Sequence, residues 1–183
     1  MPTAERAAAP VAQPAAPGPH DPAWVAYART LIGVREVAGP GNSPRIMAWI
    51  KALGPRLGVD VRDDATPWCG TFASHCISVA LPGERLPRVP VRAKSWAEFG
   101  VAAPMAAPGV VLVFGRQGGG HVGFYLGEDA THFHVLGGNQ GDAVSIARIA
   151  KSRCVAMRWP VGVRFAGRPV SLAASAPVTA NEA

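Results

Sequence analysis

The chain has 183 residues, of which 49% are hydrophobic, and it carries a formal net charge of +6 at pH 7. This length suits one domain with flexible ends and is sufficient to bury a core. The positive charge suits nucleic acid, an anionic cell wall or an anionic membrane surface. However, the Lys and Arg residues are scattered, with no run of five and no interleaved aromatic residues that would stack bases, so we expect no nucleic-acid partner.

Residues 1–20 are rich in Ala and Pro, and we expect them to form a disordered leader. They lack a basic start followed by an apolar stretch, so they predict no secretory signal. No uninterrupted apolar stretch approaches the length of about 18 residues that a membrane span needs, so we expect no membrane insertion. These features predict synthesis in the cytoplasm, and a target outside it would require a delivery route.

Two helices are predicted at the start of the folded region. Asp21 and Pro22 form an N-cap followed by proline at the first helical position. The apolar residues that follow at helical spacing are Trp24, Tyr27, Ala28 and Leu31. Ser43 and Pro44 start a second helix, whose apolar stripe consists of Ile46, Met47, Ile50 and Leu53.

A third helix begins near Pro67 or Trp68 and ends before Pro82. Its spacing places Phe72, Cys76 and Val79 on the inward face. A proline-rich stretch then leads to a short helix around residues 93–99.

After residue 109 the apolar pattern changes from helical to extended. Short runs predict strands at 110–114, 121–126, 132–136, 144–146 and 155–159, separated by turn residues such as Gly118–Gly120. Helices followed by an antiparallel meander are typical of an α+β fold. We therefore expect one α+β domain over residues 21–166, followed by a flexible tail over 167–183.

The three cysteines cannot all pair within one chain, so at least one thiol is free. Cys69 and Cys76 lie on one predicted helix at a spacing of about 10 Å, too far apart for a disulfide. Cys69 stands where a loop turns into the third helix, facing backbone N–H groups and the positive end of the helix dipole. Both features are expected to lower the pKa of its thiol and to favour a nucleophilic thiolate. A lone cysteine at such a position is more often a small core residue.

Cysteine catalysis needs an imidazole near the sulfur and a third group that orients the ring. His121 follows three glycines at the start of a predicted strand, where a substrate could approach closely. Asn139 could be the orienting group, by analogy with Cys-His-Asn sites. His132 and His134, one strand beyond His121, are competing candidates.

Three stretches in this order resemble the NlpC/P60 and CHAP families of papain-like cell-wall hydrolases: PWCGTF at 67–72, GHVGFY at 120–125 and LGGNQ at 136–140. The segments GVRE at 33–36 and GPGN at 39–42 look like the leader helix and loop of a phage-associated branch. The similarity extends over roughly residues 24–160, which is most of the predicted domain.

The resemblance implies a papain-like α+β fold with Cys69 as nucleophile and His121 as general base. In the third position the two families differ; Asn139 lies within the matching motif and is preferred, with His134 and His132 in reserve. Trp68 and Gln140 would flank the cleft as substrate contacts. Asp64, just before the nucleophile, could line it too, but a solvated loop carboxylate is the preferred expectation. The implied reaction is cleavage of an amide in bacterial peptidoglycan, in the stem peptide, its cross-link or the N-acetylmuramoyl–L-alanine bond, without a metal or another cofactor.

Two other readings remain open. His132 and His134 form a pair that zinc sites use, but the acid that metal-dependent wall peptidases place four residues after an upstream histidine is absent, because Tyr125 stands there. A cell-wall-binding or structural phage module that keeps the fold without catalysis is the non-enzymatic alternative. The delivery route, by holin, phage particle or secretion system, is not determined by the sequence.

Overall fold

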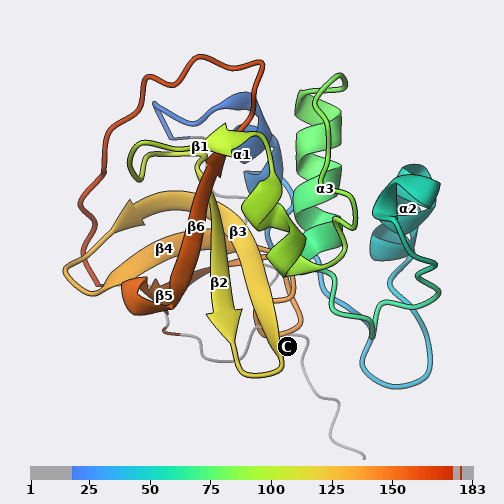
Figure 1. The fold of residues 1–183 in the computed structure, drawn as a ribbon. Helices are drawn as coiled ribbons and strands as arrows, with labels where there is room; N and C mark the ends of the chain where they lie inside the picture. Colours follow the sequence, from blue (N-terminus) through green and yellow to red (C-terminus); the bar gives the residue numbers. More distant parts are fainter. Residues whose placement is uncertain (1–17, 175–177, 179–183) are drawn as a thin grey trace, which may run out of the picture.

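The α-helices occupy the N-terminal half of the chain and the strands the C-terminal half in the computed structural model, which describes residues 18–174 and residue 178 (Figure 1). The α-helices are α1 (Ala23–Arg29), α2 (Pro44–Leu53) and α3 (Cys69–Ala80), and the 3-10 helices are η1 (Gly54–Leu57), η2 (Ala93–Glu98) and η3 (Lys151–Arg153). The strands are β1 (Val101–Ala102), β2 (Val111–Arg116), β3 (Gly119–Glu128), β4 (His132–Gly137), β5 (Ser145–Ala150) and β6 (Cys154–Trp159). The predicted α+β class is confirmed.

The six strands form one antiparallel sheet in the order β1-β6-β2-β3-β4-β5. Strands β2 to β5 follow one another as the predicted meander. The last strand does not continue this meander. Strand β6 does not pair with β5 but lies between β2 and β1, and β1 is a two-residue strand that the sequence did not predict.

Two local expectations about the helices were wrong. Asp21 does not cap α1; Pro22 is the N-cap, and the Asp21 carboxylate accepts hydrogen bonds from Arg29 at 2.5 Å and from the backbone N–H of Gly18 at 2.7 Å. Val79 is 47% exposed, because it lies in the last turn of α3, whereas Ile77 is fully buried.

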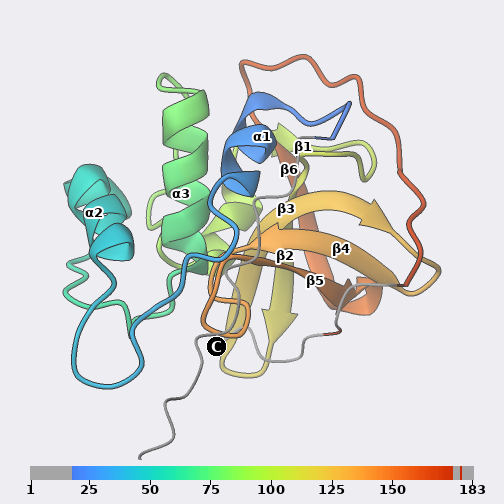
Figure 2. The same ribbon diagram turned by 180° about the vertical axis from the view of Figure 1, so that it is seen from behind.

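Helix α3 lies between the sheet and α2, and α1 lies beside it (Figures 1 and 2). Aromatic side chains join these layers: the Phe72 ring on α3 lies 6.1 Å from Phe124 on β3, measured between centroids, and 6.1 Å from Trp49 on α2. The first turns of α3 are therefore enclosed on both sides, and residues Cys69 to Ser74 are all buried. This packing fixes the helix end that carries Cys69 against the sheet.

The described part of the C-terminal segment is attached to the domain. The Val170 N–H donates to the Tyr125 hydroxyl at 3.0 Å, and Glu128 exchanges 2.8 Å backbone bonds with Val170 and Leu172. Contacts with the domain thus extend beyond the expected boundary at residue 166. The leader expected over residues 1–20 lies outside the described residues up to 17, as does most of the chain after 174. Within the described part, no helix is long and apolar enough to cross a membrane.

Candidate active site

Cys69 is the first residue of α3, and its thiol faces strand β3. The backbone N–H groups of Val122 and Gly70 both point toward its sulfur as hydrogen-bond donors. Because Val122 directly follows His121 in β3, this contact brings the thiol next to the backbone of the histidine-bearing strand. The two residues that the sequence predicted as nucleophile and base are therefore on neighbouring, packed elements.

The expected lowering of the Cys69 thiol pKa is not what the structure gives. Burial raises the pKa of this thiol, since only 3% of the residue is exposed and the thiolate loses its hydration. The N–H groups of Val122 and Gly70 and the positive charge of Arg116 act in the opposite direction but do not outweigh burial. The resting group is a thiol that needs a base to become nucleophilic.

His121 is fully buried, and Gln140 fixes its imidazole. The His121 Nε2 atom lies 3.0 Å from Gln140 Oε1. The orientation of the Gln140 amide is determined by its other contacts, because its nitrogen lies 2.6 Å from the carbonyl oxygen of Ser145 and 3.3 Å from that of Val135. Carbonyl oxygens only accept, so the amide nitrogen must face them and Oε1 must face the ring. The neutral imidazole therefore carries its proton on Nε2, which leaves Nδ1 as the basic nitrogen.

Two glycines of the LGGNQ stretch allow these side chains to approach. A Cβ on Gly137 would lie 2.9 Å from His121 Nε2 and 2.7 Å from Gln140 Oε1. A Cβ on Gly138 would lie 2.6 Å from Phe72 Cβ and 2.7 Å from Trp68 Cζ3. Contacts this short force neighbouring side chains to move, so a side chain at position 137 would displace His121 or Gln140, and one at 138 would displace Phe72 or Trp68.

The GVRE segment (33–36) and the GPGN loop (39–42) contact the residues just before Cys69 and those just after Gln140. Glu36 accepts a 3.1 Å hydrogen bond from the Trp68 indole, and the backbone of residues 33–36 pairs with residues 142–144. Asp64 is only 2% exposed and accepts hydrogen bonds from the N–H groups of Ser43 at 2.7 Å and Val37 at 3.1 Å. The expectation of a solvated Asp64 was therefore wrong, because this carboxylate anchors the GPGN loop.

The other three predicted site residues, Asn139, Trp68 and Gln140, are all buried. Asn139 is buried and has a positive φ of 59°. Trp68, expected at the cleft surface, is 1% exposed and packs in the core against Trp49. Gln140, predicted as a substrate contact, is hydrogen-bonded to His121.

His132 and His134 belong to a separate polar cluster. His134 pairs with Gly127, six residues beyond His121 on β3, which corresponds to about 20 Å along the strand. Its Nε2 lies 3.3 Å from the Asp129 carboxylate, which also accepts a 2.7 Å bond from Arg148. This bond from Arg148 is the largest influence that holds the Asp129 pKa below its usual range. Among the residues described, no group of three or more His, Cys, Asp or Glu side chains is arranged to hold a metal ion.

Cys69 opens to a cleft of about 440 Å³. Residues 59–61, 66–67 and 91–94 line it, together with Gly118–Gly120 at the start of β3. Three cationic side chains also line this cleft, namely Arg92, Lys94 and Arg116. The sequence did not single them out; the only signal was that Arg116 lies two residues before the glycine-rich approach to His121.

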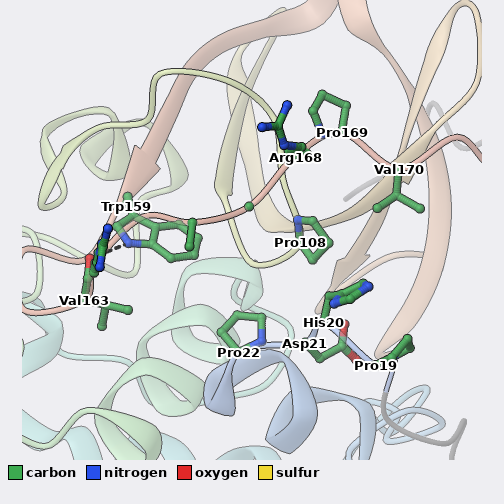
Figure 3. Close-up of a pocket in the computed structure, with 13 residues that line it drawn as sticks. Pro19, His20, Asp21, Pro22, Pro108, Trp159, Val163, Arg168, Pro169 and Val170 are labelled. Atoms are coloured by element: carbon green, nitrogen blue, oxygen red, sulfur yellow. Dashed lines mark hydrogen bonds between the residues drawn. The ribbon is translucent and has the colours of Figure 1, made fainter.

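A second hollow of about 640 Å³ contains none of the predicted site residues. Figure 3 shows it between the start of the described chain, at Pro19 to Pro22, and the C-terminal segment at Arg168 to Val170. The Trp159 indole at its edge is hydrogen-bonded to the Val163 carbonyl at 2.7 Å (Figure 3). Cys69 lines the smaller cleft, which is therefore the candidate site.

The chain matches no protein-family model, and the comparison with curated proteins found none that is significantly similar.

Proposed function

We propose that this protein is a papain-like cysteine hydrolase that cleaves an amide bond of bacterial peptidoglycan. The observation that carries the proposal is the buried bond between His121 Nε2 and Gln140 Oε1, which leaves Nδ1 as the basic nitrogen of a histidine on β3, the strand whose Val122 N–H contacts the Cys69 thiol. A nucleophile, a base and a group that orients the base are the three parts that this chemistry needs.

In the proposed reaction, His121 Nδ1 takes the Cys69 proton as the sulfur attacks the carbonyl carbon of the amide. The negative charge that develops on the carbonyl oxygen lies near the N-terminal end of α3, where backbone N–H groups and the helix dipole favour it. His121 then gives the proton to the leaving amine as the carbon–nitrogen bond breaks. Water, deprotonated by the same ring, hydrolyses the thioester and restores the thiol.

Gln140 takes the orienting role that the sequence assigned to Asn139. It holds the ring in the tautomer that the first step requires, because an acceptor at Nε2 keeps the proton on that nitrogen. His132 and His134 bind the Asp129 cluster and are not part of the proposed mechanism.

The substrate assignment rests on the resemblance of the three motifs to cell-wall hydrolases. The net charge of +6 suits an anionic wall. In this proposal the protein is made in the cytoplasm, reaches the periplasm or wall by a separate delivery route, and needs no cofactor.

One specific observation favours a non-catalytic wall-binding module as the second candidate. The Cys69 thiol is buried and its pKa is raised, which is the usual state of an inert core cysteine.

Digestion of purified peptidoglycan by the wild type and by Cys69→Ser, with the products identified by mass spectrometry, distinguishes the two candidates. Release of cross-link peptides by the wild type alone identifies an endopeptidase, and release of whole stem peptides identifies an amidase. Cys154→Ser is the matched control, since it removes a partly exposed thiol outside the site and should leave the products unchanged. Equal release by wild type and Cys69→Ser would refute the thiol mechanism, and wall binding without release by either would support the binding module.

A further inference from the structure

The cleft beside Cys69 has a strongly cationic lining that the proposed bond cleavage does not itself require. Arg92, Lys94 and Arg116 line it together with one carboxylate, Asp60, whose charge is already compensated by Arg62 at 2.6 Å. None of the three lining cations forms an ion pair within the described residues. A cleft with this charge attracts an anionic ligand.

Arg116 is the cation most closely built into the site. It is partly buried, and its Nε is enclosed without a hydrogen-bond partner in the described structure. Its charge acts on the Cys69 thiol, so the guanidinium lies within electrostatic range of the sulfur. A guanidinium left unmatched in such a position is a ready partner for a carboxylate, which it can bind through two parallel hydrogen bonds.

The glycine-rich turn allows two of these cations to lie over its backbone. A Cβ on Gly119 would lie 3.2 Å from Arg116 Nε, and a Cβ on Gly120 would lie 3.1 Å from Lys94 Cγ. The side chains of Lys94 and Arg116 therefore lie next to adjacent glycines, Gly120 and Gly119, directly before His121. The lining also includes the apolar residues Val59, Val61 and Pro67, which suit the uncharged part of a peptide.

We propose that this cleft binds a free carboxylate of the substrate between Arg116 and Lys94, so that the enzyme selects peptides with a carboxylate beside the amide bond presented to Cys69. The proposal rests on the proposed function and specifies its substrate class. Peptides in which the same group is a carboxamide have the same shape but lack the charge. They leave the guanidinium unmatched and are expected to be poor substrates.

The test compares a synthetic peptidoglycan stem peptide with free carboxylates and the same peptide with those carboxylates converted to carboxamides. Binding is measured by calorimetry with Cys69→Ala, and kcat/KM with the protein that retains Cys69. A charged hydrogen bond of this kind corresponds to a preference of about 10- to 100-fold for the free carboxylate. Arg116→Gln and Lys94→Gln should each lower that preference, whereas Arg116→Lys, which keeps the charge, should retain part of it.

Arg85→Gln is the matched control, because it removes the same charge from an exposed residue outside this cleft. Thermal melts identify any variant that fails to fold. Because Lys94 is exposed, its substitution should not affect folding, and Lys94→Gln tests the site even if Arg116→Gln does not fold. Equal binding and equal hydrolysis of the two peptides, or binding of neither, would overturn the carboxylate site. Preferential binding of the carboxylate peptide to Cys69→Ala without hydrolysis by the wild type would uphold the site and refute the hydrolase instead.

Discussion

Replacement of Gln140 by methionine tests the orientation of the imidazole directly. Methionine has a similar length but provides neither the acceptor for His121 Nε2 nor the donor for the Ser145 carbonyl. Loss of one partner of a buried hydrogen bond costs about 1–3 kcal/mol. If this free energy is lost from the transition state, kcat/KM on peptidoglycan fragments falls by about 5- to 140-fold.

Asn139→Gly is the comparison that separates the two neighbouring amides. Asn139 has a φ of 59°, which glycine adopts without strain, so this change removes the side chain and leaves the turn intact. We expect a smaller loss of kcat/KM than for Gln140→Met.

A second measurement separates orientation of the ring from general damage to the fold. The nitrogen NMR shifts of the His121 ring should show the proton on Nε2 in the wild type and in Asn139→Gly, and a mixture of tautomers in Gln140→Met. A larger loss of activity in Asn139→Gly, with the tautomer unchanged in Gln140→Met, would refute the reasoning and return the orienting role to Asn139.

Two further predictions concern the thiol and the packing beneath it. Because burial raises the Cys69 thiol pKa, alkylation of this residue by iodoacetamide should be slower than in the unfolded chain at pH 8, and its rate should still rise above pH 9. Mass spectrometry measures this rate. A rate that levels off below pH 7 would instead indicate a stable thiolate–imidazolium pair. Gly138→Ala would place a Cβ 2.6 Å from Phe72 Cβ and should destabilise the fold by about 1–3 kcal/mol in denaturant titrations. Gly83→Ala is the control, because the space around Gly83 is open and stability should change little. Equal stability of the two variants would show that the contact at Gly138 relaxes.

The sequence predicted the elements well where local signals dominate. The start of α2 at Ser43–Pro44, the end of α3 before Pro82 and the central strands all follow from spacing and turn residues. It failed where a distant partner decides the outcome. Asp21 had the composition of an N-cap, but Arg29 competes for its carboxylate, and β6 pairs with β2 across about 40 residues of intervening chain.

The candidate site shows the same division. Cys69 and His121 could be chosen from motifs because their positions, a helix start and a glycine-rich strand, are visible in the chain. The contact of Gln140 with the ring could not be predicted, because Gln140 was expected to touch substrate and only the folded structure shows its Oε1 next to His121 Nε2. The thiol pKa was predicted in the wrong direction for a related reason: the helix end is visible in sequence, but the depth of burial is not.

Burial and hydrogen bonding help to distinguish residues of the LGGNQ stretch and His121 that have a structural explanation from those that do not. Gly138 is explained by the close approach of Phe72, and the positive φ at Asn139 suits the turn that it occupies. His121 and Gln140 are different. Both are polar and almost fully buried, and an apolar pair could fill the same space without the cost of removing polar groups from water. What an apolar pair cannot do is hold a basic nitrogen in one tautomer, which is what the proposed mechanism requires of His121.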